Sequence, residues 1–322
     1  MIEISKIKKL TLEITSYCNL QCPQCARFTA DGFLTNSLST SHLSLDVFRQ
    51  GVELEKCTQL QEVEFQGEHG DCMMHPQLLD YLHLLTDVRK VILVTNGSIG
   101  NPKYFRQLAD FKNLKIVFSI DGLEDTNHIY RINSRFDKII KNATSFIDAG
   151  GEAEWKYLIF KHNQHQVEKA KELSKKIGFR KFFSKPTARN FFGTGTWPVM
   201  IEGVYSHNIE IADAINPAKK SNIIASTKEK YIEPKCSWIE KDNALYVNHR
   251  GHVLPCCMTS GTTWGQSMSD RLFRKIIGNI DNIDLHHNSL EKILQGEFYT
   301  QRLKNSWESQ KTAHHLCVSN CT

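Results

Sequence analysis

Three cysteines near the start of the chain have the spacing of a metal-ligand set. Cys18, Cys22 and Cys25 fall within eight residues, in the pattern CxxxCxxC, directly after the apolar run 10–14. A four-iron, four-sulfur cubane needs a ligand on each iron, and cysteine thiolate is the usual one. Three protein ligands therefore leave one iron open to a small molecule, as catalytic metal sites generally keep an open position. A zinc knuckle or a set of buried, unreactive thiols could have the same spacing.

The motif resembles the one carried by the radical S-adenosylmethionine (radical SAM) superfamily. In that family the open iron is chelated by the amino and carboxylate groups of S-adenosylmethionine. An electron from the reduced cluster cleaves the sulfonium and produces a 5′-deoxyadenosyl radical, which abstracts hydrogen from the substrate. Members often have an aromatic residue before the third cysteine, where this chain has Gln24. That departure leaves the three ligands unchanged.

A second group of cysteines lies in the last ninety residues. Cys236, Cys256, Cys317 and Cys321 supply four thiolates, enough for one cubane with no open iron or for a zinc ion. Their opening pattern, Cys-x14-Gly-x4-Cys, resembles that of the twitch and SPASM domains appended to many radical SAM enzymes. The resemblance implies an auxiliary 4Fe-4S cluster on these four thiolates. A full SPASM module carries seven cysteines and this region has five, which favours the shorter twitch form.

In twitch domains a β-hairpin brings the first two cysteines to the auxiliary cluster. The resemblance implies strands at 245–248 and 252–255, with Gly251 relieving the turn between them. Cys257 is then a spare thiol or the alternative to Cys256; the spacing from the glycine favours Cys256.

The composition is that of an ordinary globular protein. The chain has 322 residues, of which 40% are hydrophobic and 23% charged, enough for one large α/β domain and a smaller one. The net charge is +5 and the pI about 8.6, but Lys and Arg are scattered along the chain. A dedicated nucleic-acid binder is expected to have a higher pI and a clustered basic face, so we do not expect a nucleic-acid partner.

The sequence predicts a cytoplasmic protein without membrane contact. Residues 1–9 lack the apolar core and cleavage site of a secretory signal, and no apolar run approaches the eighteen or so residues needed to span a bilayer. The ten cysteines lie toward the two ends of the chain, with none between Cys72 and Cys236. This distribution favours a reducing compartment with thiolates reserved for metal.

Short apolar runs alternate with amphipathic segments over the first 186 residues. Predicted strands lie at 10–14, 62–65, 91–95, 114–120, 155–160 and 179–184, and predicted helices at 45–56, 76–85, 102–111, 136–149 and 165–177. Six strands with five intervening helices imply parallel strands joined by right-handed crossovers. About 175 residues are too few for the roughly 250 of an eight-fold barrel. They suit the partial (β/α)6 TIM-like barrel of radical SAM enzymes, followed here by a small α+β iron–sulfur domain.

In such barrels the chemistry lies at the C-terminal ends of the strands. After the second strand, the family carries a Gly-Gly-Glu-like motif that meets the amino group of S-adenosylmethionine. Gly70 and Asp71 are the best match in this chain, and Glu68 is the alternative.

Polar residues also follow the third and fourth strands. Thr95 and Asn96 form a polar turn found at this place in many members, and Ser119 and Asp121 suit ribose hydroxyls. Taken singly, each is more often an ordinary turn or cap residue. It is their position at successive strand ends after the CxxxCxxC motif that implies cofactor binding.

Catalytic residues are assigned only by position. Lys156 lies on the fifth strand, where alternation places it on one face with Glu154 and Leu158, and Lys185 and Arg189 follow on or after the sixth. A snorkelling surface lysine is the alternative for Lys156.

These patterns predict three segments: a radical SAM barrel at 1–190, a linker or substrate-facing loop region at 191–232, and a twitch-type domain at 233–322. Residues 187–232 look less regular than the barrel and would carry specificity.

The resemblance implies a hydrogen-abstracting oxidoreductase. A fully ligated second cluster suits electron transfer, so we expect a two-electron oxidation of a small polar metabolite or a peptide side chain, with an external donor such as a flavodoxin or ferredoxin. No leader-binding domain fits before residue 10, which favours a small molecule modestly. The alternatives are a redox-neutral lyase, epimerase or RNA-modifying enzyme with a structural second cluster, and a zinc-binding interaction protein without activity.

Overall fold

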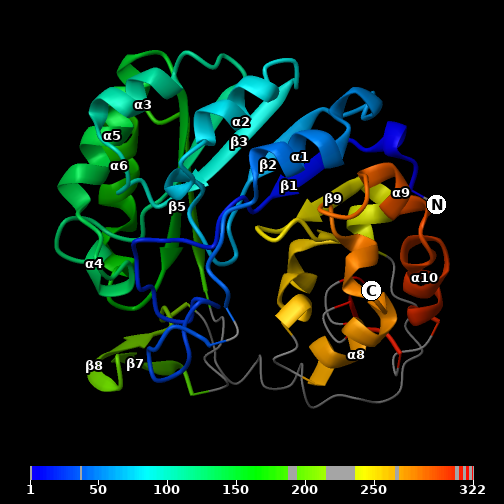
Figure 1. Cartoon of the computed structure of the whole chain (residues 1–322). Coiled ribbons are helices and arrows are strands. Elements are labelled where there is room, and N and C mark those ends of the chain that lie inside the picture. The colour runs from blue at the N-terminus through cyan, green and yellow to red at the C-terminus, as the bar shows by residue number, and fades with distance from the viewer. Residues whose placement is uncertain are drawn as a thin grey trace. The chain divides into compact units, whose positions relative to one another are not determined.

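The computed structural model describes residues 2–36, 38–187, 194–214, 236–264, 268–308, 312–314, 317–318 and 321 (Figure 1). The chain forms two compact units, each assembled from separate stretches of sequence. The first comprises Met1–Tyr17, Ser37–Val91 and Glu229–Thr322, and the second comprises Cys18–Asn36 and Ile92–Lys228. The three segments expected at 1–190, 191–232 and 233–322 therefore stay a prediction. Among the described residues, no helix is long and apolar enough to cross a bilayer.

The first unit is built around the buried strand β1 (Lys9–Leu12). β1 pairs in parallel with β2 (Glu62–Phe65) on one side and with β9 (Ala244–Val247) on the other. β10 (Val253–Leu254) then pairs antiparallel with β9. The predicted hairpin at 245–255 is thus confirmed, with Gly251 at its turn at a φ of 83°. The sequence did not reveal that this hairpin extends the sheet next to β1.

The helices of the first unit follow their predicted places with shorter ends. The predicted helix 45–56 divides into α1 (Leu45–Val52) and a short 3-10 helix, because Glu53 takes a left-handed conformation between them. Predicted helix 76–85 is α2 (Leu78–Leu84). The C-terminal part adds α8 (Met268–Ile277), α9 (Leu290–Gln295) and α10 (Leu303–Ser306).

The second unit carries the later parallel strands of the barrel. β4 (Leu114–Ser119), β5 (Glu152–Ile159) and β6 (Lys181–Pro186) pair in parallel in chain order. The boundary between the units falls within β3 (Lys90–Thr95), which comes between β2 and β4 in the strand order. The predicted six parallel strands, and with them the α/β partial-barrel class, are confirmed.

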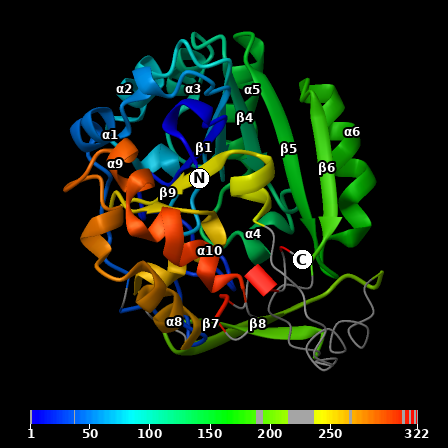
Figure 2. The same cartoon turned by 90° about the vertical axis from the view of Figure 1, so that its right-hand side faces the viewer.

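Helices cover one side of these strands. α3 (Pro102–Leu108), α5 (Phe136–Asp148) and α6 (Val167–Ile177) confirm the predicted helices, and Figure 2 shows α5 and α6 alongside β4, β5 and β6. A short helix, α4 (Asn127–Tyr130), was not predicted. Its single turn is too short to show a helical period in the sequence.

Strand β5 shows why the sheet has one apolar face. Trp155 and Tyr157 are fully buried, and the indole of Trp155 donates to the carbonyl of Ile120 at 2.9 Å. Lys156, between them, is exposed on the other face. The predicted alternation along this strand is confirmed.

The expectation that residues 187–232 are less regular was wrong for part of that range. β7 (Thr196–Ile201) and β8 (Val204–Glu210) form an antiparallel hairpin. Its two-residue turn, Glu202-Gly203, has φ values of 49° and 81°, as hairpin turns with two left-handed residues require. Val199 and Ile209 are buried in an apolar cluster with Tyr130 and Phe160, which fixes the hairpin to the second unit. Residues 188–193 and 215–235 lie outside the described residues.

A glycine ends α6 and gives a test of this fold. Gly178 has a φ of 100° and caps the helix through its backbone N–H to the carbonyls of Lys175 and Ser174. A side chain at this φ costs about 1–2 kcal/mol. We expect Gly178→Ala to lower the free energy of unfolding by about that amount, measured by urea unfolding. Lys176→Ala, an exposed change in the same helix, should be neutral to about 0.5 kcal/mol; an equal effect of both would contradict the capping role.

Candidate functional site

The three-cysteine loop lies in the second unit, and its thiols are close to one another. Cys18, Cys22 and Cys25 are each half-buried. Burial raises the pKa of Cys22 and the charge of Arg131 opposes the rise, while the thiols of Cys25 and Cys18 add to it, since thiolates repel one another; the resulting pKa is about 12. The loop therefore presents the three thiols as one group, which a cationic metal centre would convert to thiolates.

Backbone and amide groups hold this loop in place. Arg27 donates from Nη1 to the carbonyl of Cys18 at 3.1 Å, and the backbone N–H of Cys25 donates to the carbonyl of Cys22 at 3.2 Å. Asn96, one of the residues assigned to the cofactor, donates from Nδ2 to Cys18 Sγ at 3.8 Å and to Asn19 Oδ1 at 3.0 Å. In this structure the turn after β3 thus orients the first cysteine.

The turn itself is held by Thr95. Thr95 is buried, and its hydroxyl accepts from the backbone N–H of Gly97 at 3.1 Å. Ser119, at the end of β4, is 9% exposed. Contacts of Thr95, Asn96 and Ser119 with S-adenosylmethionine stay predictions.

Asp121 is paired with an arginine. Its side chain is fully buried, and both carboxylate oxygens accept hydrogen bonds at 2.6 Å, one from Arg131 Nε and one from the backbone N–H of Leu158. Arg131 Nη1 in turn lies 3.9 Å from Cys22 Sγ. Asp121 therefore positions an arginine beside a cysteine of the motif, and its contact with a ribose hydroxyl stays a prediction.

Sequence reasoning missed Arg131 as a functional residue. It lies ten residues after Asp121, with no spacing typical of a motif, so only the fold could pair them. Burial alone would lower the pKa of Arg131, but Asp121 and Cys22 raise it, so the guanidinium keeps its charge. Asn163 is a second buried polar residue near Asp121. It is fully buried and joins β4 to β5 by donating from Nδ2 to the carbonyls of Asp121 at 2.7 Å and Leu158 at 2.9 Å.

The loop expected to meet the amino group of S-adenosylmethionine lies in the first unit. Gly70 packs so closely on β1's continuation that a Cβ would lie 2.0 Å from the carbonyl oxygen of Thr15. Asp71 is buried, its backbone N–H donates to Tyr17 O at 2.9 Å, and its carboxylate caps the 3-10 helix Cys72–Met74 through Met73 N. The backbone of this loop is thereby fixed against Thr15 and Tyr17, which come just before the cysteine motif in the sequence.

The lysines proposed for catalysis lie on one face of neighbouring strands. In the β5–β6 register, Lys156 is paired with Phe183, and Leu158 is paired with Lys185. Both lysines are exposed. Arg189 lies outside the described residues. Their catalytic roles stay predictions.

The four C-terminal cysteines come together within the first unit. Burial, together with the neighbouring thiols of Cys256, Cys321 and Cys236, raises the pKa of Cys317 to about 12. Cys236 and Cys256 each accept backbone hydrogen bonds at sulfur, which act against the rise by stabilising the thiolate. Such bonds are typical of cluster-binding thiolates.

The structure distinguishes two adjacent cysteines. The Cys256 thiol lies near the Cys321 thiol and accepts backbone hydrogen bonds. The Cys257 thiol is instead hydrogen-bonded to the Glu68 carboxylate. Burial raises the pKa of Cys257, and the charge of Glu68 raises it further, so this thiol stays protonated. The arrangement supports Cys256 as the ligand. It also gives Glu68 a partner other than the cofactor.

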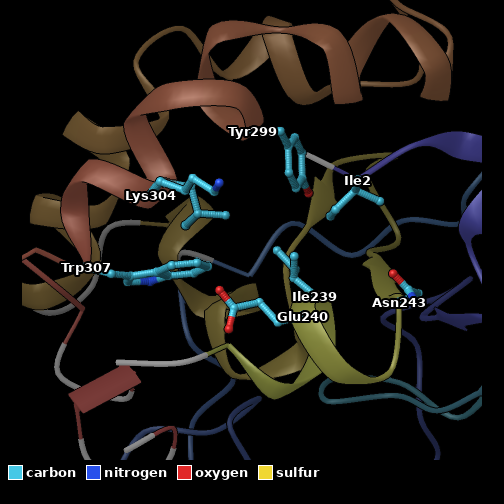
Figure 3. A pocket seen from close by; sticks show the side chains of 8 residues that line it. Ile2, Ile239, Glu240, Asn243, Tyr299, Lys304 and Trp307 are labelled. Carbon is cyan, nitrogen blue, oxygen red and sulfur yellow. The ribbon is translucent and has the colours of Figure 1, made fainter. Parts of the chain in front are cut away.

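A cavity of about 260 Å³ lies in the first unit next to the helical turn that follows Cys236 (Figure 3). Its wall combines the rings of Tyr299 and Trp307 with the charged ends of Glu240 and Lys304. Its lining residues are Ile2, Ile239, Glu240, Asn243, Tyr299, Leu303, Lys304 and Trp307. All eight residues belong to the first unit, and none belongs to the three-cysteine loop.

Comparisons with known proteins bear on the C-terminal part of the chain and on the fold. A family model of the SPASM iron–sulfur cluster-binding domain matches residues 236–322. An AdoMet-dependent heme synthase of Methanosarcina barkeri is 24% identical over 183 residues, 55% of this chain and 50% of that protein. The chain thus spans about half the length of this curated relative.

Solved structures share the fold. SuiB of Streptococcus suis, bound to S-adenosylmethionine, is 17% identical, with a TM-score of 0.55 over 82% of this chain and 63% of that one. The structure of anSMEcpe with bound AdoMet is 13% identical, with a TM-score of 0.56 over 97% of this chain and 91% of that one.

The cysteine motif, the parallel strands and the matched C-terminal domain point to one family. Residues 236–322 match the SPASM iron–sulfur cluster-binding family, and the chain shares its fold with SuiB and anSMEcpe, two proteins whose structures contain bound S-adenosylmethionine. Both findings support the resemblance of this chain to the radical SAM superfamily.

Proposed function

We propose that this chain is an oxidoreductase that abstracts a hydrogen atom from its substrate and passes a second electron to an auxiliary cluster. One observation carries the proposal: the chain has a group of three thiols and a separate group of four. Three thiols leave one iron open, whereas four leave none. A site for generating a radical and a site for accepting an electron are therefore both provided.

Cys18, Cys22 and Cys25 would hold the first cluster. With S-adenosylmethionine bound, this cluster supplies the electron that releases the 5′-deoxyadenosyl radical. The chain's own contribution is position and charge. Asn96 orients Cys18, and the charge of Arg131 favours the thiolate of Cys22.

The fixed backbone at Gly70 and Asp71 suits the amino group of S-adenosylmethionine. A turn that cannot admit a Cβ keeps its carbonyl groups in one orientation, which a bound ammonium can use. Both carboxylate oxygens of Asp121 already accept hydrogen bonds, from Arg131 and from Leu158. Ser119 and backbone groups at the strand ends are therefore the first candidates for ribose recognition.

Cys236, Cys256, Cys317 and Cys321 would hold the auxiliary cluster. After hydrogen abstraction, an oxidation must remove one further electron and one proton, and a fully ligated cluster can take the electron. Lys156 and Lys185, exposed on β5 and β6, are the candidates for accepting the proton, which either can do only as the neutral amine.

The substrate class is a small polar metabolite or a peptide side chain. The heme synthase relative points to a small molecule, and the structures of SuiB with the precursor peptide SuiA and of anSMEcpe with the Cp18Cys peptide point to peptides. A flavodoxin or ferredoxin would supply the first electron.

Counting iron tests the two clusters. After anaerobic reconstitution we expect about eight irons per chain in the wild type and about four in a Cys18/Cys22/Cys25→Ala variant, with reductive cleavage of S-adenosylmethionine lost in the variant. Cys57→Ala, which removes a buried thiol outside both groups, should keep all eight. About four irons in the wild type and almost none in the variant would contradict both the electron-acceptor role and the oxidoreductase assignment.

The pair of Asp121 and Arg131 gives a second test. Arg131→Gln leaves a buried carboxylate without its cation, so we expect a loss of about 3–5 kcal/mol in the free energy of unfolding, measured by urea unfolding. Asp121→Asn combined with Arg131→Gln should recover at least half of that loss. Arg135→Gln, at an exposed pair with Asp137, should cost less than about 1 kcal/mol. Equal losses at the two arginines would contradict the positioning role of Arg131.

A further inference from the structure

A buried group of one carboxylate and two imidazoles lies apart from both sets of cysteines. Glu13 follows β1, His69 lies in the loop after β2, and His249 lies in the turn between β9 and β10. All three belong to the first unit and are at most 3% exposed, and their ligand atoms lie within 4.8 Å of one another. We propose that Glu13, His69 and His249 bind one divalent transition-metal ion, separate from the iron–sulfur clusters.

The donor set is one that metals of the zinc and ferrous class prefer. Two imidazoles with one carboxylate occur in both zinc and non-heme iron sites. Metal–ligand bonds of about 2.0–2.2 Å place neighbouring ligand atoms roughly 3–3.5 Å apart. Glu13 Oε1 and His69 Nδ1 are 3.1 Å apart, which suits two ligands of one ion.

The charge of the site also favours a cation. The Glu13 carboxylate is 1% exposed, and a charge buried to this degree needs a compensating partner. Its contacts are the ring nitrogen Nδ1 and the backbone N–H of His69 and the hydroxyl of Tyr246. None of these groups carries a permanent positive charge. A divalent ion would supply it; a proton on His69 is the alternative.

Further groups fix the orientation of each ligand, as partners of metal ligands commonly do. The Ser41 hydroxyl lies 2.8 Å from His249 Nδ1, so the opposite nitrogen, Nε2, is the one that would bind the metal. Ser41 is itself held by its backbone N–H, which donates to the Ser16 hydroxyl at 2.9 Å. Tyr246 donates to Glu13 Oε2 at 2.8 Å.

Such an ion would join three distant stretches of sequence. It would link the end of β1, the loop that carries Gly70 and Asp71, and the hairpin that leads to Cys256. The site is fully buried, so its effect would be structural: it would hold the loop and the hairpin in register.

Metal content tests the site. The full chain is reconstituted anaerobically with iron and sulfide, incubated with Zn²⁺, desalted, and analysed for zinc and iron in the wild type, Glu13→Gln and His249→Gln. The control is His252→Gln, which alters a buried histidine of the same hairpin that lies near Asp284 instead. We expect about one zinc per chain in the wild type and control, and at least a five-fold loss in the other two, with iron unchanged.

Absence of zinc from the wild type, or equal zinc in all four proteins, would overturn the metal site and leave a proton on His69 as the counter-charge. Because the readout is zinc and not activity, the result is independent of the proposed oxidation. If Glu13→Gln and His249→Gln do not fold, zinc-edge X-ray absorption of the wild type decides. Bonds of about 2.0–2.1 Å to nitrogen and oxygen support the site, and bonds of about 2.3 Å to sulfur contradict it.

Discussion

Parallel pairing of β1 on both sides is the constraint on which the first unit depends. A strand buried on both faces and paired along both edges has one register, because a shift of one residue would turn its apolar side chains to the wrong face. That register fixes where the chain leaves the sheet. The next residues, Glu13, Thr15 and Tyr17, come just before the cysteine motif in the sequence. They contact His69, Gly70 and Asp71 respectively. Placement of the loop proposed for S-adenosylmethionine thus follows from a backbone ladder.

Two buried carboxylates show how each unit deals with charge. Asp121 meets the permanent cation of Arg131, which reaches on to Cys22. Glu13 meets imidazoles and a phenol, so its compensation depends on a proton or a metal ion. In both places an acid near a proposed cofactor region acts by positioning its neighbours.

The C-terminal hairpin has a double role. β9 completes the sheet beside β1, and the residues after β10 bring Cys256 to the other three thiols. Since β9 is paired with β1, the auxiliary thiols rest on the sheet that also carries the loop after β2. Relative placement of the cysteine pair at 256 and 257 follows from the same geometry: one sulfur accepts backbone N–H groups and the next meets Glu68.

The sequence by itself determined the number of ligands in each thiol group, the alternation of strands and helices, and the hairpin at Gly251. Covalent spacing limits which thiols can share a metal, and side-chain periodicity shows which face is buried, so both are readable without a fold. Only the tertiary structure decided that Arg131 meets Asp121, that His69 and His249 meet Glu13, and that Cys256 differs from Cys257. The first two contacts join residues that have no fixed spacing in the sequence. The two cysteines are identical neighbours, and the surroundings that distinguish one from the other exist only once the chain has folded.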